Sequence, residues 1–233
     1  MIELLVAMAI TSIIMLVLLS LVGQSTTGYT QTQRAVNTLS QARAFMQFFD
    51  REISTRLPST PLIYETVKES GGPSTSDKVA FIRAIPQDEQ STTSPGDLGT
   101  SIYYVDFTAD SGNALSPKLF RKTLNPDDTQ TLLESGTTPP LPALSPATDE
   151  PIIPNVLKFQ AKPKYRNASG KLVDWTSSST EPPSVIHVLV IFIDESSARR
   201  FRTQAEWDRL ASTPHDTERQ LIRTFNRSIA IAK

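Results

Sequence analysis

The sequence predicts an α+β fold in which one long N-terminal helix packs on an antiparallel β-sheet domain. Three observations support this prediction. An uncharged apolar run opens the chain, an apolar stripe at helical spacing follows it, and the remainder holds short runs of β-branched and aromatic residues between turn formers. With 233 residues, the chain is long enough for one medium-sized domain with such an appendage.

The apolar run extends from Leu4 to Val22 and is interrupted only by hydroxyl side chains. A helix of about 19 residues covers close to 30 Å, the thickness of a bilayer's hydrocarbon core. A secretory signal peptide would have a basic start and a shorter apolar region, whereas no Lys or Arg precedes Arg34. A buried core helix is the other interpretation, but such helices rarely stay uncharged for so long. We therefore predict a transmembrane helix over residues 1–23, with apolar side chains at Leu4, Leu5, Val6, Ile10, Ile13, Ile14, Leu16, Val17 and Leu21.

The helix is predicted to continue beyond this run as an amphipathic segment over residues 24–57. Its apolar residues recur at steps of three and four and form one stripe. Pro58 ends the segment, because the residue before a proline is pushed out of the α region. The stripe has to be buried, and the rest of the chain is the candidate to cover it. We therefore predict that these residues pack on the sheet: Val36, Leu39, Met46, Phe49, Ile53 and Leu57.

Residues 58–233 are predicted to form a β-rich globular domain. Five runs are rich in Val, Ile, Phe and Tyr and are bounded by turn residues: Val79–Ile85, Ile102–Phe107, Leu119–Leu124, Val156–Ala161 and Val185–Ile193. The last of these runs is apolar on both faces, which predicts a central strand. We expect Lys118–Leu124 to pair with Ile102–Phe107 as an antiparallel hairpin.

The segments between and after these strands are predicted from turn formers and weaker patterns. The proline-rich residues 139–154 predict an exposed loop without regular structure. Thr203–Leu210 predicts a short helix, and Leu221–Ala232 a last strand or an extended tail.

The composition argues against several kinds of chemistry. A formal net charge of −1 provides no field that attracts nucleic acid. No cysteine and only two histidines are present, which leaves no thiolate site and argues against most histidine metal sites. Asp106, Asp110 and Asn113 suggest a calcium loop, but their spacing is not that of an EF-hand, and acidic residues in turns are usually turn formers. We expect no metal, no cofactor, no catalytic residue and no enzymatic activity, since a nucleophile elbow and a phosphate loop are absent too.

The opening residues Ile2-Glu3-Leu4-Leu5-Val6-Ala7-Met8-Ala9-Ile10 resemble the N-terminus of type IV prepilins and type II secretion pseudopilins. In that family a prepilin peptidase removes a basic leader after a glycine, the new N-terminal residue is methylated, and a glutamate precedes the apolar helix. The resemblance implies that Glu3 is this glutamate, which pairs with the N-terminal amine of a neighbouring subunit and sets axial register. By its residue type alone, Glu3 is better explained as a carboxylate stabilised by the helix dipole, and the resemblance favours the assembly role instead. We expect the reading frame to extend upstream and to encode the leader.

Within this family the chain resembles the J-type minor pseudopilins and the pilin-like proteins called Verru_Chthon cassette protein C. The segments that carry the second likeness are Asn155-Val156, Asp174-Trp175 and Ile193-Asp194-Glu195-Ser196-Ser197-Ala198, in this order. The resemblance implies a minor subunit with a domain of several antiparallel strands.

Two functions from different classes follow. The first is a structural minor pilin- or pseudopilin-like subunit of an envelope filament, in a type II secretion or type IV pilus-like system. Its partners would be other such subunits through the N-terminal helix, the inner membrane, and a prepilin peptidase if a leader exists upstream. We expect a single pass through the bacterial inner membrane, the C-terminal domain in the periplasm, and extraction into a filament. The alternative is a membrane-tethered binding or adhesive domain that uses the same anchor.

Overall fold

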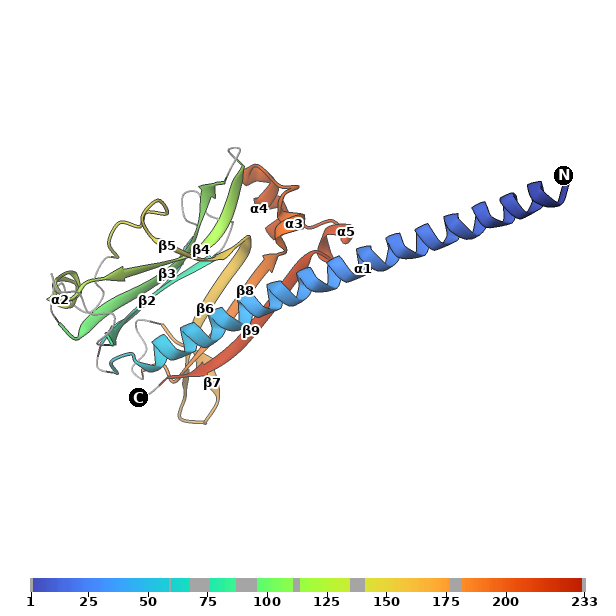
Figure 1. Ribbon diagram of the computed structural model, residues 1–233. Helices are drawn as coiled ribbons and strands as arrows, with labels where there is room; N and C mark the ends of the chain where they lie inside the picture. The colour runs from blue at the N-terminus through green and yellow to red at the C-terminus, as the bar shows by residue number, and fades with distance from the viewer. Residues whose placement is uncertain are drawn as a thin grey trace. The chain divides into compact units, whose positions relative to one another are not determined.

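The computed structural model describes residues 2–58, 60–67, 76–86, 96–110, 114–134, 141–176 and 182–231. The chain divides into two compact units, residues 1–40 and 41–233, and each is described by itself. The second unit contains two antiparallel β-sheets with short helices and the end of a longer one (Figure 1). The α+β class predicted from the sequence is therefore confirmed.

Helix α1 runs from Ile2 to Ser54. It ends before Leu57, the predicted last residue, because the chain pairs with a strand instead. The N–H of Leu57 donates to the carbonyl of Ile82 at 3.0 Å, and the N–H of Ala84 donates to the carbonyl of Thr55 at 3.1 Å. The predicted boundary was therefore wrong: backbone pairing with a distant segment, and not Pro58, terminates the helix.

Sheet A has five strands in the order β1-β2-β3-β4-β5, all antiparallel to their neighbours. Its strands are β1 (Leu62–Val67), β2 (Ser76–Ala84), β3 (Leu98–Ala109), β4 (Leu115–Leu124) and β5 (Glu150–Pro154). The predicted hairpin is confirmed, because β3 pairs with β4 and places Tyr104 opposite Phe120. The strands extend beyond the predicted runs on both sides of the turn.

Strand β5 contradicts the prediction that residues 139–154 form a loop without regular structure. The strand has only one neighbour, β4, and lies at the edge of sheet A. An edge strand has one side whose N–H groups need no ladder partner, so it accommodates Pro151 and Pro154. Composition cannot reveal this, since it depends on which strand lies beside β5.

Sheet B has four strands in the order β7-β6-β8-β9, also antiparallel. They are β6 (Val156–Arg166), β7 (Leu172–Asp174), β8 (Val185–Ile193) and β9 (Ile222–Ala230). β8 has the predicted bounds and lies between β6 and β9, which confirms it as a central strand. Its alternate residues Ile186, Val188, Val190 and Phe192 are buried in the core between the sheets.

The two sheets are connected at several points. The chain passes from β5 to β6 through the single residue Asn155, which has a φ of 58°, in the left-handed region that asparagine tolerates better than most residues. The Ser76 hydroxyl accepts a hydrogen bond from the N–H of Phe159 at 3.4 Å, and the Asp77 carboxylate accepts one from the N–H of Ala161 at 3.0 Å. Side chains of β2 therefore satisfy N–H groups on β6, whose pairing with β7 begins only at Lys164.

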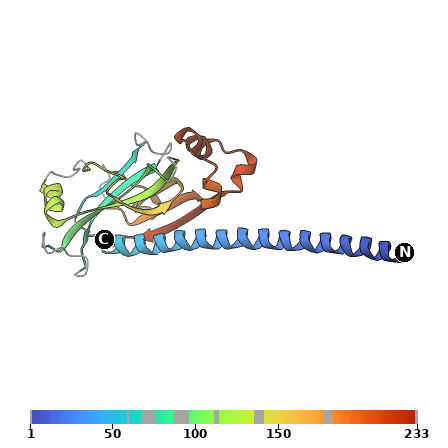
Figure 2. The same ribbon diagram turned by 45° about the horizontal axis from the view of Figure 1, so that its top comes forward.

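The main core contains side chains from both sheets and from the last turns of α1, which Figure 2 shows against the strands. Phe49 packs edge-on against Phe81 and Tyr103 of sheet A and against Phe159 of sheet B. Its side chain is fully buried. The end of α1 is thus an integral part of this core.

The described part of the domain also contains four short helices: α2 (Pro126–Glu134), α3 (Glu195–Ala198), α4 (Gln204–Ser212) and α5 (Asp216–Arg219). Helix α4 corresponds to the helix predicted over Thr203–Leu210, and its Trp207 packs in a second core with Leu157 and Ile193. β1, β7 and α2 were not predicted from the sequence. β1 and β7 are short strands of mixed composition, and α2 has no apolar stripe long enough to detect.

Candidate functional site

The candidate site is the surface of α1 in residues 1–40, where the described side chains are exposed. Ile13, Ile14, Leu16, Val17 and Leu21, all predicted apolar helix positions, have between 54% and 67% of their side-chain surface exposed. Leu4, Leu5, Val6 and Ile10 were predicted with them, and their side chains lie outside the described residues. Large apolar side chains in such a continuous run are a feature of surfaces that bind another apolar partner.

The hydroxyl groups on this stretch bind the helix itself. Ser12 donates to the carbonyl of Met8, Thr26 to that of Val22 and Thr32 to that of Gly28, each at 2.9 Å. Because each hydroxyl already has a partner four residues back, burying it against an apolar surface leaves no unsatisfied donor. Ser12, which interrupts the apolar run, is therefore compatible with burial.

None of the helices in the described part of the chain combines the length and the hydropathy that a membrane crossing requires. The transmembrane helix predicted over residues 1–23 is therefore not supported. Hydroxyl side chains interrupt its described apolar residues from Thr11 onward, and Gly23, Gln24 and Ser25 follow them.

Glu3 lies in the first turn of α1 and is exposed. This position is compatible with both interpretations given above, a carboxylate that interacts with the helix dipole and one that a neighbouring subunit pairs.

The predicted packing stripe of α1 is divided. Val36 and Leu39 belong to residues 1–40 and are 54% and 36% exposed, and their packing on the sheet stays a prediction. Met46, Phe49 and Ile53 are buried, and Leu57 is half-buried beyond the helix. Burial begins at Ala42, and Phe45, which the prediction omitted, is also in the core.

A buried charged cluster holds the end of α1 to sheet A. The Glu52 carboxylate accepts hydrogen bonds from the Tyr103 hydroxyl and from the Arg121 guanidinium, and Arg83 lies 3.3 Å away. Glu52 is only 4% exposed. Arg83, Tyr103 and Arg121 come from β2, β3 and β4, so one helical carboxylate joins three neighbouring strands.

The electrostatics of this cluster favour a neutral Tyr103 phenol and a charged Arg121 guanidinium beside Glu52. Burial raises the pKa of Tyr103 well above its usual value, and the charge of Glu52 raises it further. Burial opposes the charge of Arg121, but the Glu52 carboxylate outweighs it and raises the Arg121 pKa. Tyr103 therefore stays a hydrogen-bond donor and Arg121 a cation at neutral pH.

Two further contacts fix the same turns of α1. The Arg121 guanidinium lies 5.0 Å from the ring centroid of Phe48, a favourable cation–π geometry. Asp50 forms an ion pair with Arg227 of β9. The helix is thereby attached to both sheets in residues 45–53, whereas the apolar side chains of residues 11–22 are left exposed.

The residues considered for a calcium site do not form one in the described part of the chain. Asp110 accepts hydrogen bonds from Ser116 at 2.5 Å and from Lys118 at 2.6 Å, Asp106 bonds its neighbouring backbone N–H, and Asn113 lies outside the described residues. Among the described residues, no group of three His, Cys, Asp or Glu side chains could hold a metal ion.

No protein-family model and no curated protein matches this chain. Among solved structures, it is similar to a chain of "The Crystal Structure of the GspK-GspI-GspJ complex from enterotoxigenic Escherichia coli Type 2 Secretion System". The sequence identity is 10%, the alignment covers 84% of this chain and 98% of that chain, and the TM-score is 0.41. A TM-score this low, at this identity, is insufficient to transfer the fold or the function of that chain.

Proposed function

We propose that this protein is a structural, pseudopilin-like subunit of a filament in the bacterial envelope, and that it has no catalytic role. The observation that carries the proposal is a helix with two different environments. Residues 42–53 of α1 are built into the core of the domain, while large apolar side chains such as Leu16 and Leu21 are exposed. A domain that displays an apolar helix in this way gains stability when other helices cover it.

The free energy gained by covering these apolar side chains is large enough to support assembly with other helices. Burying one Leu, Ile or Val side chain stabilises a complex by roughly 1.5–3 kcal/mol. Several such residues, including Ile13, Leu16 and Val17, are available on one segment. Even after the cost of association, about 4–15 kcal/mol, a helix bundle with neighbouring subunits would be favourable. We propose that these neighbours are other pilin-like subunits.

The role proposed for Glu3 rests on its resemblance to the family's glutamate and on its position in the first helical turn. In a helix bundle, its carboxylate would pair with the N-terminal amine of the adjacent subunit. This pairing would select one axial register, because a shift of the helices leaves both charges unpaired in apolar surroundings.

We further propose that the subunit is associated with the inner membrane, with residues 41–233 in the periplasm. The exposed apolar side chains support this location, and a prepilin peptidase would act on a leader encoded upstream. Carbonate extraction of envelope fractions tests the association: the proposal expects the full-length protein in the pellet, and recovery in the supernatant contradicts it.

Site-specific photocross-linking tests the assembly. Because the chain has no cysteine, single cysteines can carry a benzophenone maleimide at chosen positions. Leu16→Cys and Leu21→Cys probe the exposed segment, and Gln47→Cys is the matched control, an exposed position on the domain part of the same helix. Adducts with other pilin-like subunits, identified by mass spectrometry, are expected at Leu16 and Leu21 only.

The same experiment with Glu3→Ala separates assembly from simple tethering. If Glu3 pairs with a neighbouring amine, its loss should lower the adduct yield by tenfold or more, which corresponds to about 1.4 kcal/mol, while the amount of protein in the envelope is unchanged. Adduct yields that are independent of Glu3 would favour the alternative function, a tethered binding or adhesive domain.

A further inference from the structure

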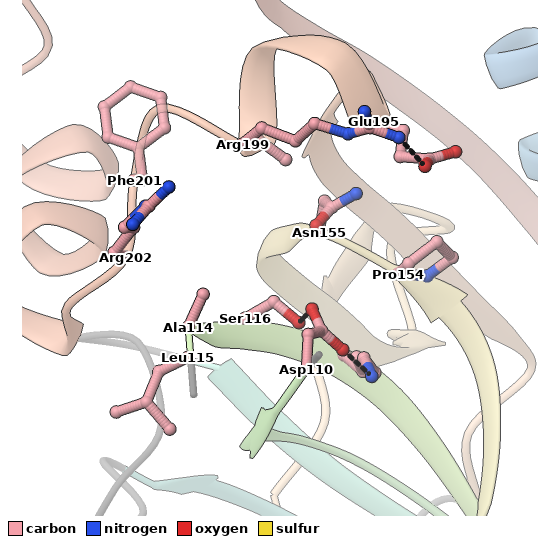
Figure 3. Close-up of a pocket in the computed structure, with 12 residues that line it drawn as sticks. Asp110, Ala114, Leu115, Ser116, Pro154, Asn155, Glu195, Arg199, Phe201 and Arg202 are labelled. Carbon is pink, nitrogen blue, oxygen red and sulfur yellow. Dashed lines mark hydrogen bonds and ion pairs between the residues drawn. The ribbon is translucent and has the colours of Figure 1, made fainter. Parts of the chain in front are cut away.

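A pocket of about 680 Å³ is lined by residues of the domain (Figure 3). They come from Asp110 and the first residues of β4, from the junction of β5 and β6, and from α3 with the connection that follows it. Its volume is within the range of roughly 300–1,000 Å³ typical of small-ligand sites. Neither the fold nor the proposed assembly requires this space.

Some charged residues of the pocket already neutralise each other. Lys118 and Ser116 hydrogen-bond to Asp110 from within the pocket wall (Figure 3). Burial alone would raise the pKa of Asp110, but the hydrogen bonds from Lys118 and Ser116 bring it below its usual value. Arg199 and Glu195 form an exposed ion pair at 3.0 Å. Neither carboxylate is therefore available to attract a cation.

Arg202 differs from Lys118 and Arg199 because its hydrogen bonds are made by its backbone and not by its guanidinium group. The carbonyl of Arg202 accepts a hydrogen bond from the N–H of Leu115 at 2.9 Å, and its N–H donates to Glu206 at 2.8 Å. Within the described residues, its exposed side chain makes no hydrogen bond or ion pair. Since the cations Lys118, Arg199 and Arg202 outnumber the anions Asp110 and Glu195 by three to two, the lining has a net charge of +1.

Asn155 supplies a second polar group from another wall of the pocket, away from Arg202 in Figure 3. It is only 6% exposed, and within the described residues its side-chain amide has no hydrogen-bond partner. Its backbone is fixed by the positive φ and by its carbonyl, which accepts from the N–H of Ile193 at 3.1 Å. A side-chain amide that makes no hydrogen bond to the protein can donate to a ligand that enters the pocket.

We propose that this pocket binds a carboxylate group, with the Arg202 guanidinium as its cationic partner and the Asn155 amide as a hydrogen-bond donor. A guanidinium presents a planar fork that matches the two oxygens of a carboxylate. The small net charge and the two nearby anions disfavour a doubly charged phosphate. The carboxylate would come either from a free small acid or from an acidic side chain of a polypeptide.

Trp207 provides a reporter of binding. Its indole N–H donates to the carbonyl of Leu115 at 2.8 Å, and Leu115 lines the pocket. The chain has two tryptophans, so Trp207→Phe assigns the two indole signals in a ¹H–¹⁵N spectrum of the full-length chain in detergent. The probes are succinate and the blocked peptide Gly-Glu-Gly, with Gly-Gln-Gly and sodium chloride as controls.

Saturable movement of the Trp207 signal with succinate or with the Glu peptide, but with neither control, is the expected result. Movement with succinate indicates a free acid as the ligand, and movement with the Glu peptide indicates an acidic side chain of a polypeptide. Arg202→Gln should weaken binding by about tenfold or more, since it removes a charge-assisted pair. Asn155→Gly, which suits a positive φ, should weaken it by about threefold. The matched control Arg200→Gln, an exposed neighbour outside the lining, should leave binding unchanged.

Two results would overturn the carboxylate site. One is a Trp207 signal that does not saturate with either acid probe, and the other is equal binding by wild type and Arg202→Gln. This outcome is independent of filament assembly, because no residue of the pocket lies on α1.

Discussion

Glu52 is the residue on which the attachment of α1 to sheet A depends most. Glu52→Gln keeps the shape of the side chain but removes the buried anion that Arg83 and Arg121 share. Breaking a buried pair in this way costs about 3–5 kcal/mol. We expect a loss at the lower end of that range, because Arg121 also contacts Glu150. Urea unfolding of residues 25–233, followed by tryptophan fluorescence, measures it.

The matched control for this prediction is Glu150→Gln. Glu150 also pairs with Arg121, but its side chain is 61% exposed, and exposed pairs contribute about 0–1 kcal/mol. If the two variants lost the same small amount of stability, the buried cluster would not be the anchor described here.

Glu218 provides a prediction for pH. Two hydrogen bonds from Arg209, at 2.6 and 2.8 Å, lower the pKa of Glu218 from 4.5 to about 2. Because the folded-state pKa is the lower one, the pair stabilises the fold above pH 4.5, and this contribution is lost as the pH falls from 4.5 towards 2. An NMR titration of the carboxyl carbon should therefore have its midpoint near 2.

Arg209→Gln should move the Glu218 midpoint upward, although the N–H of His215 still donates to this carboxylate at 2.9 Å. A wild-type midpoint at the ordinary glutamate value of 4.5 would contradict the pair. The expected effect on global stability is small, because the Arg209 side chain is 37% exposed and solvent screens the pair.

At the scale of elements, α4 illustrates how a local motif supports tertiary packing. Thr203 and Glu206 form a capping box, in which the Glu206 carboxylate accepts from the Thr203 N–H at 2.9 Å. This cap orients the helix so that Trp207 fills the second core. Thr203→Ala should destabilise the domain by about 1 kcal/mol, the usual effect of losing an N-cap.

Thermal unfolding monitored by circular dichroism checks the capping prediction, with Thr213→Ala as the control. Thr213 lies at the other end of the same helix, and its hydroxyl makes only a 3.5 Å contact with the Arg209 carbonyl. The control should change stability by less than about 0.5 kcal/mol. A loss as large as that of Thr203→Ala would show that helix composition, and not the cap, is responsible.

An element can be predicted from the sequence when the residues that cause it to form lie close together in the chain. β3, β4, β6 and β8 were found because dense β-branched and aromatic residues lie between turn formers. β5 was missed because proline is normally excluded from strands, and only its place at the sheet edge permits it.

At the scale of the whole molecule, the divided environment of α1 predicts the behaviour of truncated proteins. Removing residues 1–24 deletes exposed apolar side chains but none of the core, so residues 25–233 should be soluble and folded. Removing residues 1–57 also deletes Phe45, Phe49 and Ile53, which exposes the apolar faces of both sheets and should give insoluble protein. Soluble yield and analytical gel filtration measure the difference.

Equal solubility of the two truncated proteins would contradict the role of α1 in the core. A substitution distinguishes the effect of losing a core side chain from the effect of shortening the chain. Phe49→Asp in residues 25–233 should reproduce the insolubility, whereas Gln47→Asp, at an exposed position of the same helix, should not.

The sequence by itself determined the features whose physical cause lies within a few residues of each other. These are the helix-forming apolar spacing, the strands with dense β-branched residues, and the absence of thiol chemistry. Only the tertiary structure decided how far the helix residues are covered, since Met46 and Leu57 belong to one stripe but only Met46 is fully buried. It also brought Glu52 to Arg121, and Arg202 and Asn155 to the lining of one pocket. Such pairs join segments far apart in the chain, and no local pattern encodes a contact that exists only after the two sheets have packed.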